Sequence, residues 1–210
     1  MKPLHIVIAG NIGAGKTSLT NLLAQEFDYK PYFESVDDNP YLADLYSNAE
    51  LWSFHTQVYF LTTRFRAHKL IQRLVRDEMK TCIQDRSIYE DRHIFARMHN
   101  ESGLLKYREF SSYIALYEQM TEFLTPPDLL IYLQKSSEVL LDNIKRRNRT
   151  YEAGIDPNYI VSLNSYYDDW VDSYSLGEKV IISSDTLDFV NRKDDAAYVL
   201  DRVHSAARQF

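Results

Sequence analysis

One short segment near the N-terminus constrains the fold of this chain more than any other feature. Residues 10–17 read Gly-Asn-Ile-Gly-Ala-Gly-Lys-Thr, which matches the pattern Gly-x-x-x-x-Gly-Lys-Ser/Thr of loops whose backbone N–H groups surround phosphate oxygens. An apolar run at 4–9 predicts a buried strand before this loop, and residues 17–27 predict a helix after it. A helix N-terminus favours anions through its dipole, so this context indicates a phosphate-binding loop.

The last residues of the loop carry side chains that suit a nucleoside triphosphate. The ammonium group of Lys16 can reach the β- and γ-phosphates, and the hydroxyl of Thr17 can hold Mg²⁺. We therefore expect ATP as phosphate donor and Mg²⁺ as cofactor. The residues of this segment that we assign to ATP binding are Gly10, Asn11, Ile12, Gly13, Ala14, Gly15, Lys16, Thr17 and Ser18.

Other classes of phosphate-loop protein find little support in the sequence. A GTPase needs an Asp-x-x-Gly element, and none of the six glycines has an aspartate three residues before it. The segment 191–194 (Asn-Arg-Lys-Asp) has its lysine in the wrong position for a guanine-reading loop. An arginine-rich segment at 145–149 favours a small-molecule kinase, because such a segment can close over the phosphates and exclude water.

Strands and helices alternate along the chain, which predicts an α/β fold with a parallel sheet covered by helices on both faces. We expect a five-stranded sheet of the P-loop nucleoside or nucleotide kinase type, in a single domain at 1–210 with an arginine-rich lid at about 145–154. The expected strands are 4–9, 31–34, 81–85, 129–133 and 180–182, and the expected helices are 17–27, 50–79, 88–100, 106–124, 137–149, 157–174 and 194–208.

Composition and charge limit the partners of the chain. The net charge of −6 argues against nucleic acid or an anionic membrane, because both favour a basic surface. No apolar run approaches the ~18 residues of a membrane span, and the short apolar run at the N-terminus does not resemble a signal peptide. We therefore expect a cytoplasmic protein without nucleic-acid or membrane partners. The single cysteine, Cys82, is interpreted as a buried core residue.

Four further stretches follow the phosphate loop in order. They are Phe33-Glu34-Ser35, Tyr46 with Gln57, Asp85-Arg86-Ser87 with Asp91, and Arg147-x-Arg149-x-x-Glu152. Together with the loop they resemble the deoxynucleoside kinase family over essentially the whole chain, especially its bacterial deoxyadenosine/deoxyguanosine kinase branch. The resemblance implies a homodimer that transfers the ATP γ-phosphoryl group to the 5′-hydroxyl of a purine deoxynucleoside, a nucleotide salvage step. Deoxyadenosine is the first choice of substrate and deoxyguanosine the second.

Three residues are candidates for the catalytic centre. The resemblance assigns Glu34 to the nucleoside 5′-hydroxyl, whose proton must leave as the oxygen bonds to phosphorus. Asp85 is a candidate ligand of Mg²⁺ and a rival candidate for the base, with Glu34 preferred. Arg86 would bridge the 5′ region and the transferred phosphate, because a guanidinium group can donate two parallel hydrogen bonds.

The resemblance also implies residues that hold the sugar and the base. Tyr46 and Glu152 match the pair that binds the sugar 3′-hydroxyl, and a tyrosine packed against the sugar would exclude a ribose 2′-hydroxyl by crowding. The amide of Gln57 would read the edge of the base with a paired donor and acceptor.

The choice of base is expected to depend on Arg64 and Asp91. Family members with an arginine and an aspartate at these positions phosphorylate purine deoxynucleosides or deoxycytidine. Buried polar groups of this kind reject a base that leaves them unpaired. Phe95, one helical turn beyond Asp91, would stack on the base.

Two segments are expected to contact the rest of ATP. Arg147 and Arg149 match the lid arginines of the family, and Gly154 would serve as a hinge. The loop 184–191, which contains Asp188 and Phe189, resembles the loop that holds the adenine of ATP.

Three alternatives remain open at this point. A deoxycytidine kinase would use the same residues, whereas broad-specificity deoxynucleoside kinases of this family tend to have small or apolar residues at the positions of Arg64 and Asp91. A nucleoside monophosphate kinase shares the loop and the lid but needs extra basic residues near its acceptor. A nucleotide-binding module that has lost catalysis would have to retain Lys16, Thr17, Glu34 and Arg86 without using them.

Overall fold

The alternating strands and helices form a five-stranded parallel sheet. In the computed structural model, which describes residues 2–34, 36–149, 152 and 154–210, the strand order is β2-β3-β1-β4-β5 and every adjacent pair is parallel. The predicted fold class is therefore confirmed. The strands are β1 (His5–Ala9), β2 (Lys30–Tyr32), β3 (Cys82–Asp85), β4 (Leu129–Gln134) and β5 (Glu178–Ser183).

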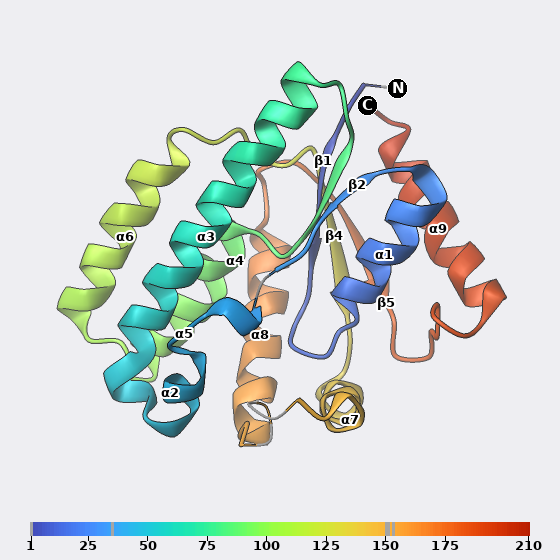
Figure 1. Cartoon of the computed structure of the whole chain (residues 1–210). Coiled ribbons are helices and arrows are strands. Elements are labelled where there is room, and N and C mark those ends of the chain that lie inside the picture. The colour runs from blue at the N-terminus through green and yellow to red at the C-terminus, as the bar shows by residue number, and fades with distance from the viewer. Residues whose placement is uncertain (1, 35, 150–151, 153) are drawn as a thin grey trace.

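Helices cover both faces of the sheet (Figure 1). Side chains of β1 alternate between two cores, because successive residues of a strand point to opposite faces. Ile6 and Ile8 belong to the core on the side of α1, α7 and α9, whereas Val7 and Ala9 belong to the core on the side of α3, α6 and α8. The bounds of these helices are α1 (Lys16–Phe27), α3 (Ala49–Asp77), α6 (Tyr107–Thr121), α7 (Ser137–Arg147), α8 (Pro157–Ser173) and α9 (Lys193–Ala207).

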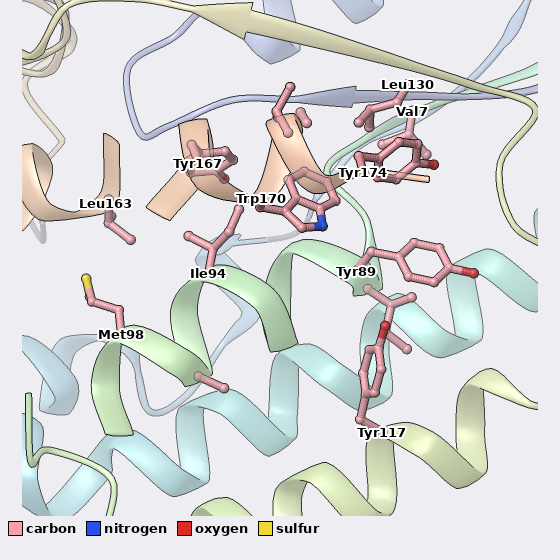
Figure 2. Close-up of a cluster of buried hydrophobic side chains, with 14 of the residues drawn as sticks. Val7, Tyr89, Ile94, Met98, Tyr117, Leu130, Leu163, Tyr167, Trp170 and Tyr174 are labelled. Carbon is pink, nitrogen blue, oxygen red and sulfur yellow. The ribbon is translucent and has the colours of Figure 1, made fainter. Parts of the chain in front are cut away.

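Aromatic rings dominate the core on the α8 side of the sheet (Figure 2). Tyr132 of β4 and Tyr167 of α8 stack with their ring centroids 5.9 Å apart. Trp170 and Tyr174 continue the aromatic surface toward the end of α8. Large buried rings contribute much of the apolar area in a core, so these contacts hold α8 against the sheet.

The expected helix at 88–100 is interrupted by a π-helical stretch. It consists of α4 (Ile88–Glu90), the π-helical residues Asp91–Ala96, labelled η2, and α5 (Arg97–Glu101). Stretches of this kind are frequently found at functional sites. Hydrophobic periodicity did not indicate the change, because the stretch is short.

The segment between β2 and α3 also differs from expectation. The structure adds a short 3-10 helix, η1 (Val36–Asp38), and α2 (Leu42–Ser47), both too short to give a periodic signal. β2 ends at Tyr32, so Glu34 follows the strand rather than ending it. The other expected elements are present with bounds shifted by a few residues, as helix and strand ends commonly are.

Some expectations lie outside the described residues or are not tested by the structure. Ser35 and three residues of the expected lid, 150, 151 and 153, are not described. Closure of the lid and the single-domain organisation stay predictions. Cys82 is buried, as expected. Within the described ranges, no helix has both the length and the apolar character needed to cross a membrane.

Candidate active site

The phosphate loop joins β1 to α1 and turns at its glycines. Gly13 has a φ angle of +85°, and a Cβ atom there would meet the backbone oxygen of Leu140 at 2.8 Å, so only glycine fits. The Lys16 ammonium donates to the backbone oxygen of Asn11 at 3.1 Å. Burial lowers the pKa of Lys16 to about 8. A bound phosphate would favour the charged form, so the loop suits an anionic ligand.

Asp85 ends β3 beside the phosphate loop. Its Oδ2 accepts a hydrogen bond from the Thr17 hydroxyl at 2.5 Å, and its Oδ1 is buried without a hydrogen-bond partner among the described residues. An unpartnered buried oxygen is costly unless a ligand or water satisfies it. A carboxylate and a hydroxyl in contact are suitable ligands for Mg²⁺, which also binds waters and substrate phosphates. Thr17 and Asp85 therefore fit this ion.

A metal ion held by protein side chains alone is not supported by the part of the chain that the structure describes. Those residues contain no group of three or more His, Cys, Asp or Glu side chains that could hold a metal. An ion at Thr17 and Asp85 would therefore depend on phosphate oxygens and waters for its other ligands.

Arg86 follows Asp85 and lies between the phosphate loop and Glu34. Its φ angle of +68° is uncommon for a residue other than glycine and turns the chain sharply after β3. The guanidinium Nε donates to Glu34 Oε2 at 3.0 Å, and Nη2 donates to the Gly10 backbone oxygen at 3.4 Å. Its Nη1 contacts the Tyr167 hydroxyl and lies 3.5 Å from Glu90 Oε1.

Glu90 and Tyr167 support Arg86, and neither residue was expected at the site from the sequence. The Tyr167 hydroxyl accepts from Arg86 and donates to Glu90 Oε1 at 2.8 Å. Glu90 also accepts from the Ser87 backbone N–H at 2.9 Å, which closes a capping box at the start of α4. The Ser-x-x-Glu spacing of 87–90 is the pattern of a capping box, so Glu90 could have been expected from the sequence at the start of this helix. No local pattern marks Tyr167.

Glu34 lies just after β2, and its carboxylate contacts two guanidinium groups. Oε2 accepts from Arg86, and Oε1 contacts Arg64 of α3. Burial raises the pKa of Glu34 to about 7, and the charge of Arg86 opposes that rise. A carboxylate with a pKa near neutrality can accept a proton from an acceptor hydroxyl.

Arg64 also contacts Asp91 at the start of η2. Both side chains are buried, and the Arg64 guanidinium lies over the Phe60 ring, 4.7 Å from its centroid. The arginine and the aspartate expected to select the base are thus brought together. Phe95, expected to stack on the base, packs on the guanidinium of Arg86 at 4.8 Å.

Gln57 lies two turns before Arg64 on α3. Its side chain is buried, and its Oε1 has no hydrogen-bond partner within the described ranges. A buried amide oxygen left open in this way suits a ligand that offers an N–H donor.

One cavity collects the residues expected to hold the nucleoside and to catalyse transfer. It lies between the phosphate loop, α2, α3 and η2. The predicted residues that line it are Ile12, Gly13, Lys16, Thr17, Glu34, Tyr46, Gln57, Arg64, Asp85, Arg86, Asp91, Phe95, Arg147, Arg149 and Glu152. Further lining residues, which were not expected from the sequence, are Val36, Leu42, Leu45, Thr56, Phe60 and Tyr159. Three of these belong to the two short helices that periodicity did not reveal.

A second cavity extends from the phosphate loop to the loop before α9. The expected ATP-binding residues that line it are Gly13, Ala14, Gly15, Lys16, Thr17, Ser18, Arg147, Arg149, Asp188 and Phe189. Lys135 and Asn143 line it as well and were not expected. The Phe189 side chain is largely buried, and Asp188 Oδ1 accepts from the Asn191 backbone N–H at 3.1 Å.

Asn11 and Gly10 line neither cavity, whereas Ile12 lines the first. The Asn11 amide instead donates to the Ile160 backbone oxygen at 3.0 Å and to Asn164 Oδ1 at 2.8 Å. Asn11 therefore ties the phosphate loop to α8.

The lid segment pairs its arginines with Glu152. The Arg147 Nε donates to Glu152 Oε2 at 3.1 Å, and the Arg149 Nη1 lies 3.9 Å from Oε1. The Glu152 side chain is only 5% exposed. This glutamate, expected at the sugar 3′-hydroxyl, lines the first cavity and is paired there with two partly exposed arginines.

The fold and this site define a class of protein. A phosphate loop beside a carboxylate–guanidinium cluster, at the carboxyl ends of parallel strands, is the arrangement of a P-loop kinase. The deoxynucleoside kinase family model matches residues 6–208. The chain belongs to the deoxynucleoside kinase family, and it is an ATP-dependent kinase.

Individual relatives agree with this assignment. The chain is similar to the deoxyadenosine/deoxycytidine kinase of Bacillus subtilis, with 35% identity over 95% of this chain and 91% of the relative. It is 38% identical to the deoxyguanosine kinase of Lactobacillus johnsonii, over 98% of this chain and 93% of the relative. The solved deoxyadenosine kinase from M. mycoides, with products dCMP and a flexible dCDP bound, has a TM-score of 0.83 and 25% identity, covering 96% of this chain and 100% of that chain.

Proposed function

We propose that the chain transfers the γ-phosphoryl group of ATP to the 5′-hydroxyl of a purine deoxynucleoside, with deoxyadenosine preferred over deoxyguanosine. The position of Glu34 carries this proposal. Its carboxylate is bonded to Arg86 beside the phosphate loop, and it lines the same cavity as Gln57, Arg64 and Asp91. A nucleoside hydroxyl bound at Glu34 would lie between the Glu34 carboxylate, which can act as a general base, and the ATP phosphates at the phosphate loop.

Glu34 is the proposed general base. The acceptor hydroxyl must lose its proton as its oxygen bonds to phosphorus, and the Glu34 carboxylate can take that proton. The pKa of Glu34, which burial raises to about 7, suits proton transfer. Asp85 has a buried Oδ1 without a hydrogen-bond partner among the described residues, beside the Thr17 hydroxyl. Its proposed role is therefore to hold Mg²⁺ together with Thr17. When bound, this ion would neutralise charge on the phosphates.

Positive charges from three parts of the chain would stabilise the transferred phosphoryl group. Lys16 comes from the phosphate loop and Arg86 from the end of β3, and both are buried. Arg147 and Arg149 line both cavities, so they can contact a group that passes between donor and acceptor. In a site that excludes water such charges are worth more than in solution.

The base and the sugar have proposed contacts in the first cavity. Gln57 would pair with the base edge, and Arg64 with Asp91 would complete the polar recognition. Phe95 would stack on the base, while Tyr46 and Glu152 would hold the sugar. The names of the relatives, which include deoxyadenosine and deoxyguanosine kinases, support a purine.

Deoxycytidine is a second candidate substrate. The B. subtilis relative is named for deoxyadenosine and deoxycytidine, and the M. mycoides enzyme was solved with dCMP and dCDP bound. The Arg64–Asp91 contact suits either base, since both present a paired donor and acceptor.

A homodimer in the cytoplasm is proposed from the family resemblance. Apolar side chains exposed on α3 and α6, including Leu51, Leu70 and Leu116, support such an interface. These helices lie together at one side of the molecule (Figure 1). Sedimentation velocity should give twice the monomer mass, and a monomer at micromolar concentration would count against this arrangement.

A coupled assay of ATP consumption tests the proposed substrate. The panel contains the four deoxynucleosides, their ribose counterparts and dAMP. We expect the highest kcat/KM with deoxyadenosine, and slow turnover with adenosine. A higher kcat/KM for deoxycytidine would favour the second candidate.

A further inference from the structure

A third cavity lies across η2 from the nucleoside cavity and contains residues that the proposed reaction does not use. The same helical stretch serves both cavities: Asp91 and Phe95 line the first, whereas Arg92 and His93 line this one. Its other walls come from α4, the C-terminal part of α6 and the end of α8. It is therefore separate from the site of phosphoryl transfer.

Aromatic rings form the walls of this cavity. Tyr89, Tyr117, Trp170 and Tyr174 all line it, and each is less than 10% exposed. In Figure 2 the rings of Trp170 and Tyr89 lie between Tyr174 above and Tyr117 below. Faces of this kind favour a flat ring that stacks or packs edge to face. The walls thus select for an aromatic ligand.

Two buried polar atoms at the cavity have no partner in the described part of the chain. They are the hydroxyl of Tyr174, a residue that is 92% buried, and the Nε of Arg92. Leaving such groups unsatisfied is unfavourable, and a ligand with acceptor oxygens would satisfy both. The Tyr174 and Arg92 side chains therefore favour an acceptor on the ligand.

The charges around the cavity favour a negative ligand. None of the described residues that line it is acidic, and Arg92 carries a positive charge. Burial and the neighbouring Arg92 and Arg97 lower the pKa of His93 to about 4, so this ring is neutral near pH 7. Arg92 Nη2 lies 3.8 Å from the Glu118 carboxylate, whose side chain is largely exposed, so this ion pair is weak.

We propose that this third cavity is a binding site for a planar aromatic carboxylate, with the ring between Trp170 and the surrounding tyrosines and the carboxylate at Arg92 and Tyr174. The ligand would be a small metabolite of one or two rings. This proposal stands independently of which nucleoside the first cavity accepts.

Isothermal titration calorimetry, in which 2-naphthoate is added to the whole chain, tests the proposed site. We expect a dissociation constant on the order of 0.1 to 1 mM, typical of a ligand with about a dozen heavy atoms. The uncharged 2-naphthamide should bind about tenfold more weakly, because it lacks the charge that pairs with Arg92. A non-hydrolysable ATP analogue together with deoxyadenosine should leave 2-naphthoate binding unchanged. Competition with that pair would place the probe in the first cavity and overturn the proposal.

Two variants and a matched control locate the probe. Arg92→Met should weaken 2-naphthoate by about tenfold and Tyr174→Phe by about threefold. Arg97→Met removes a nearby exposed charge that does not line the cavity, so it should change binding little. The melting temperature of each variant checks folding. No binding of 2-naphthoate to the wild-type chain, or equal binding to folded Arg92→Met, would mean that the cavity holds only water.

Discussion

Arg64 contacts two carboxylates at once, with Nη2 against Glu34 and Nη1 against Asp91. The Arg64 side chain therefore links Glu34, the proposed general base, to Asp91, the aspartate proposed to recognise the nucleobase. All three side chains are no more than 12% exposed. Charge interactions are strong at such burial, so a change at Arg64 should affect both nucleoside binding and turnover.

Arg64→Met should therefore reduce kcat/KM for deoxyadenosine by roughly 100-fold, because losing a hydrogen bond to a charged group costs about 1.5–3 kcal/mol. Steady-state kinetics with saturating ATP measure the effect. Arg66 lies exposed on the same helix, so Arg66→Met is the matched control and should retain wild-type kinetics. Equal kcat/KM for both variants would show that Arg64 does not take part.

Glu34→Gln should lower kcat by about 10²- to 10⁴-fold, the usual contribution of a general base. Because Glu34 does not line the second cavity, ATP binding measured by titration should be unchanged. Glu26 on α1 is exposed, and Glu26→Gln serves as a control. Wild-type turnover by Glu34→Gln would move the role of base to Asp85.

The activity should depend on pH through Glu34. Burial raises its pKa from 4.5 to about 7, so the carboxylate is increasingly protonated, and unable to accept a proton, as the pH falls below that value. At saturating ATP, kcat should fall about tenfold per pH unit on the acid side and level off above about 8. A kcat that stays constant between about pH 6 and about pH 8 would contradict a general base with this pKa.

Tyr167→Phe removes the hydroxyl that joins Arg86 to Glu90. We expect about 1–3 kcal/mol of destabilisation, because buried polar groups lose a partner, and a fall in kcat with little change in the KM for ATP. Chemical denaturation and steady-state kinetics measure the two effects. The neighbouring Tyr166 hydroxyl bonds to the exposed Glu101 at 2.6 Å, so Tyr166→Phe should change neither quantity. If the two variants behave alike, Tyr167 does not position Arg86.

Much of the fold could be predicted from the sequence because its long elements have strong periodicity. The apolar run of β4 and the spacing of α3 indicate their class and length without tertiary information. α2 and η2 could not be predicted in this way. α2 has only six residues, and η2 changes the helical repeat within an otherwise regular helix.

The candidate site was partly predictable for a similar reason. Lys16 and Thr17 belong to a short motif that follows a strand, and Asp85 ends a strand, so their place at the carboxyl edge of the sheet could be inferred. Tyr167 could not, since its contact with Arg86 joins positions 81 residues apart. The pairing of Glu152 with Arg147 depends on the fold of the lid and was also not anticipated.

Phosphorus NMR of the products tests the central claim most directly, because it identifies the acceptor. With ATP, Mg²⁺ and deoxyadenosine, we predict a new 5′-monophosphate signal for dAMP and an equal amount of ADP. With dAMP in place of deoxyadenosine we predict no dADP. Formation of dADP from dAMP, with deoxyadenosine and the other deoxynucleosides left unphosphorylated, would contradict the account.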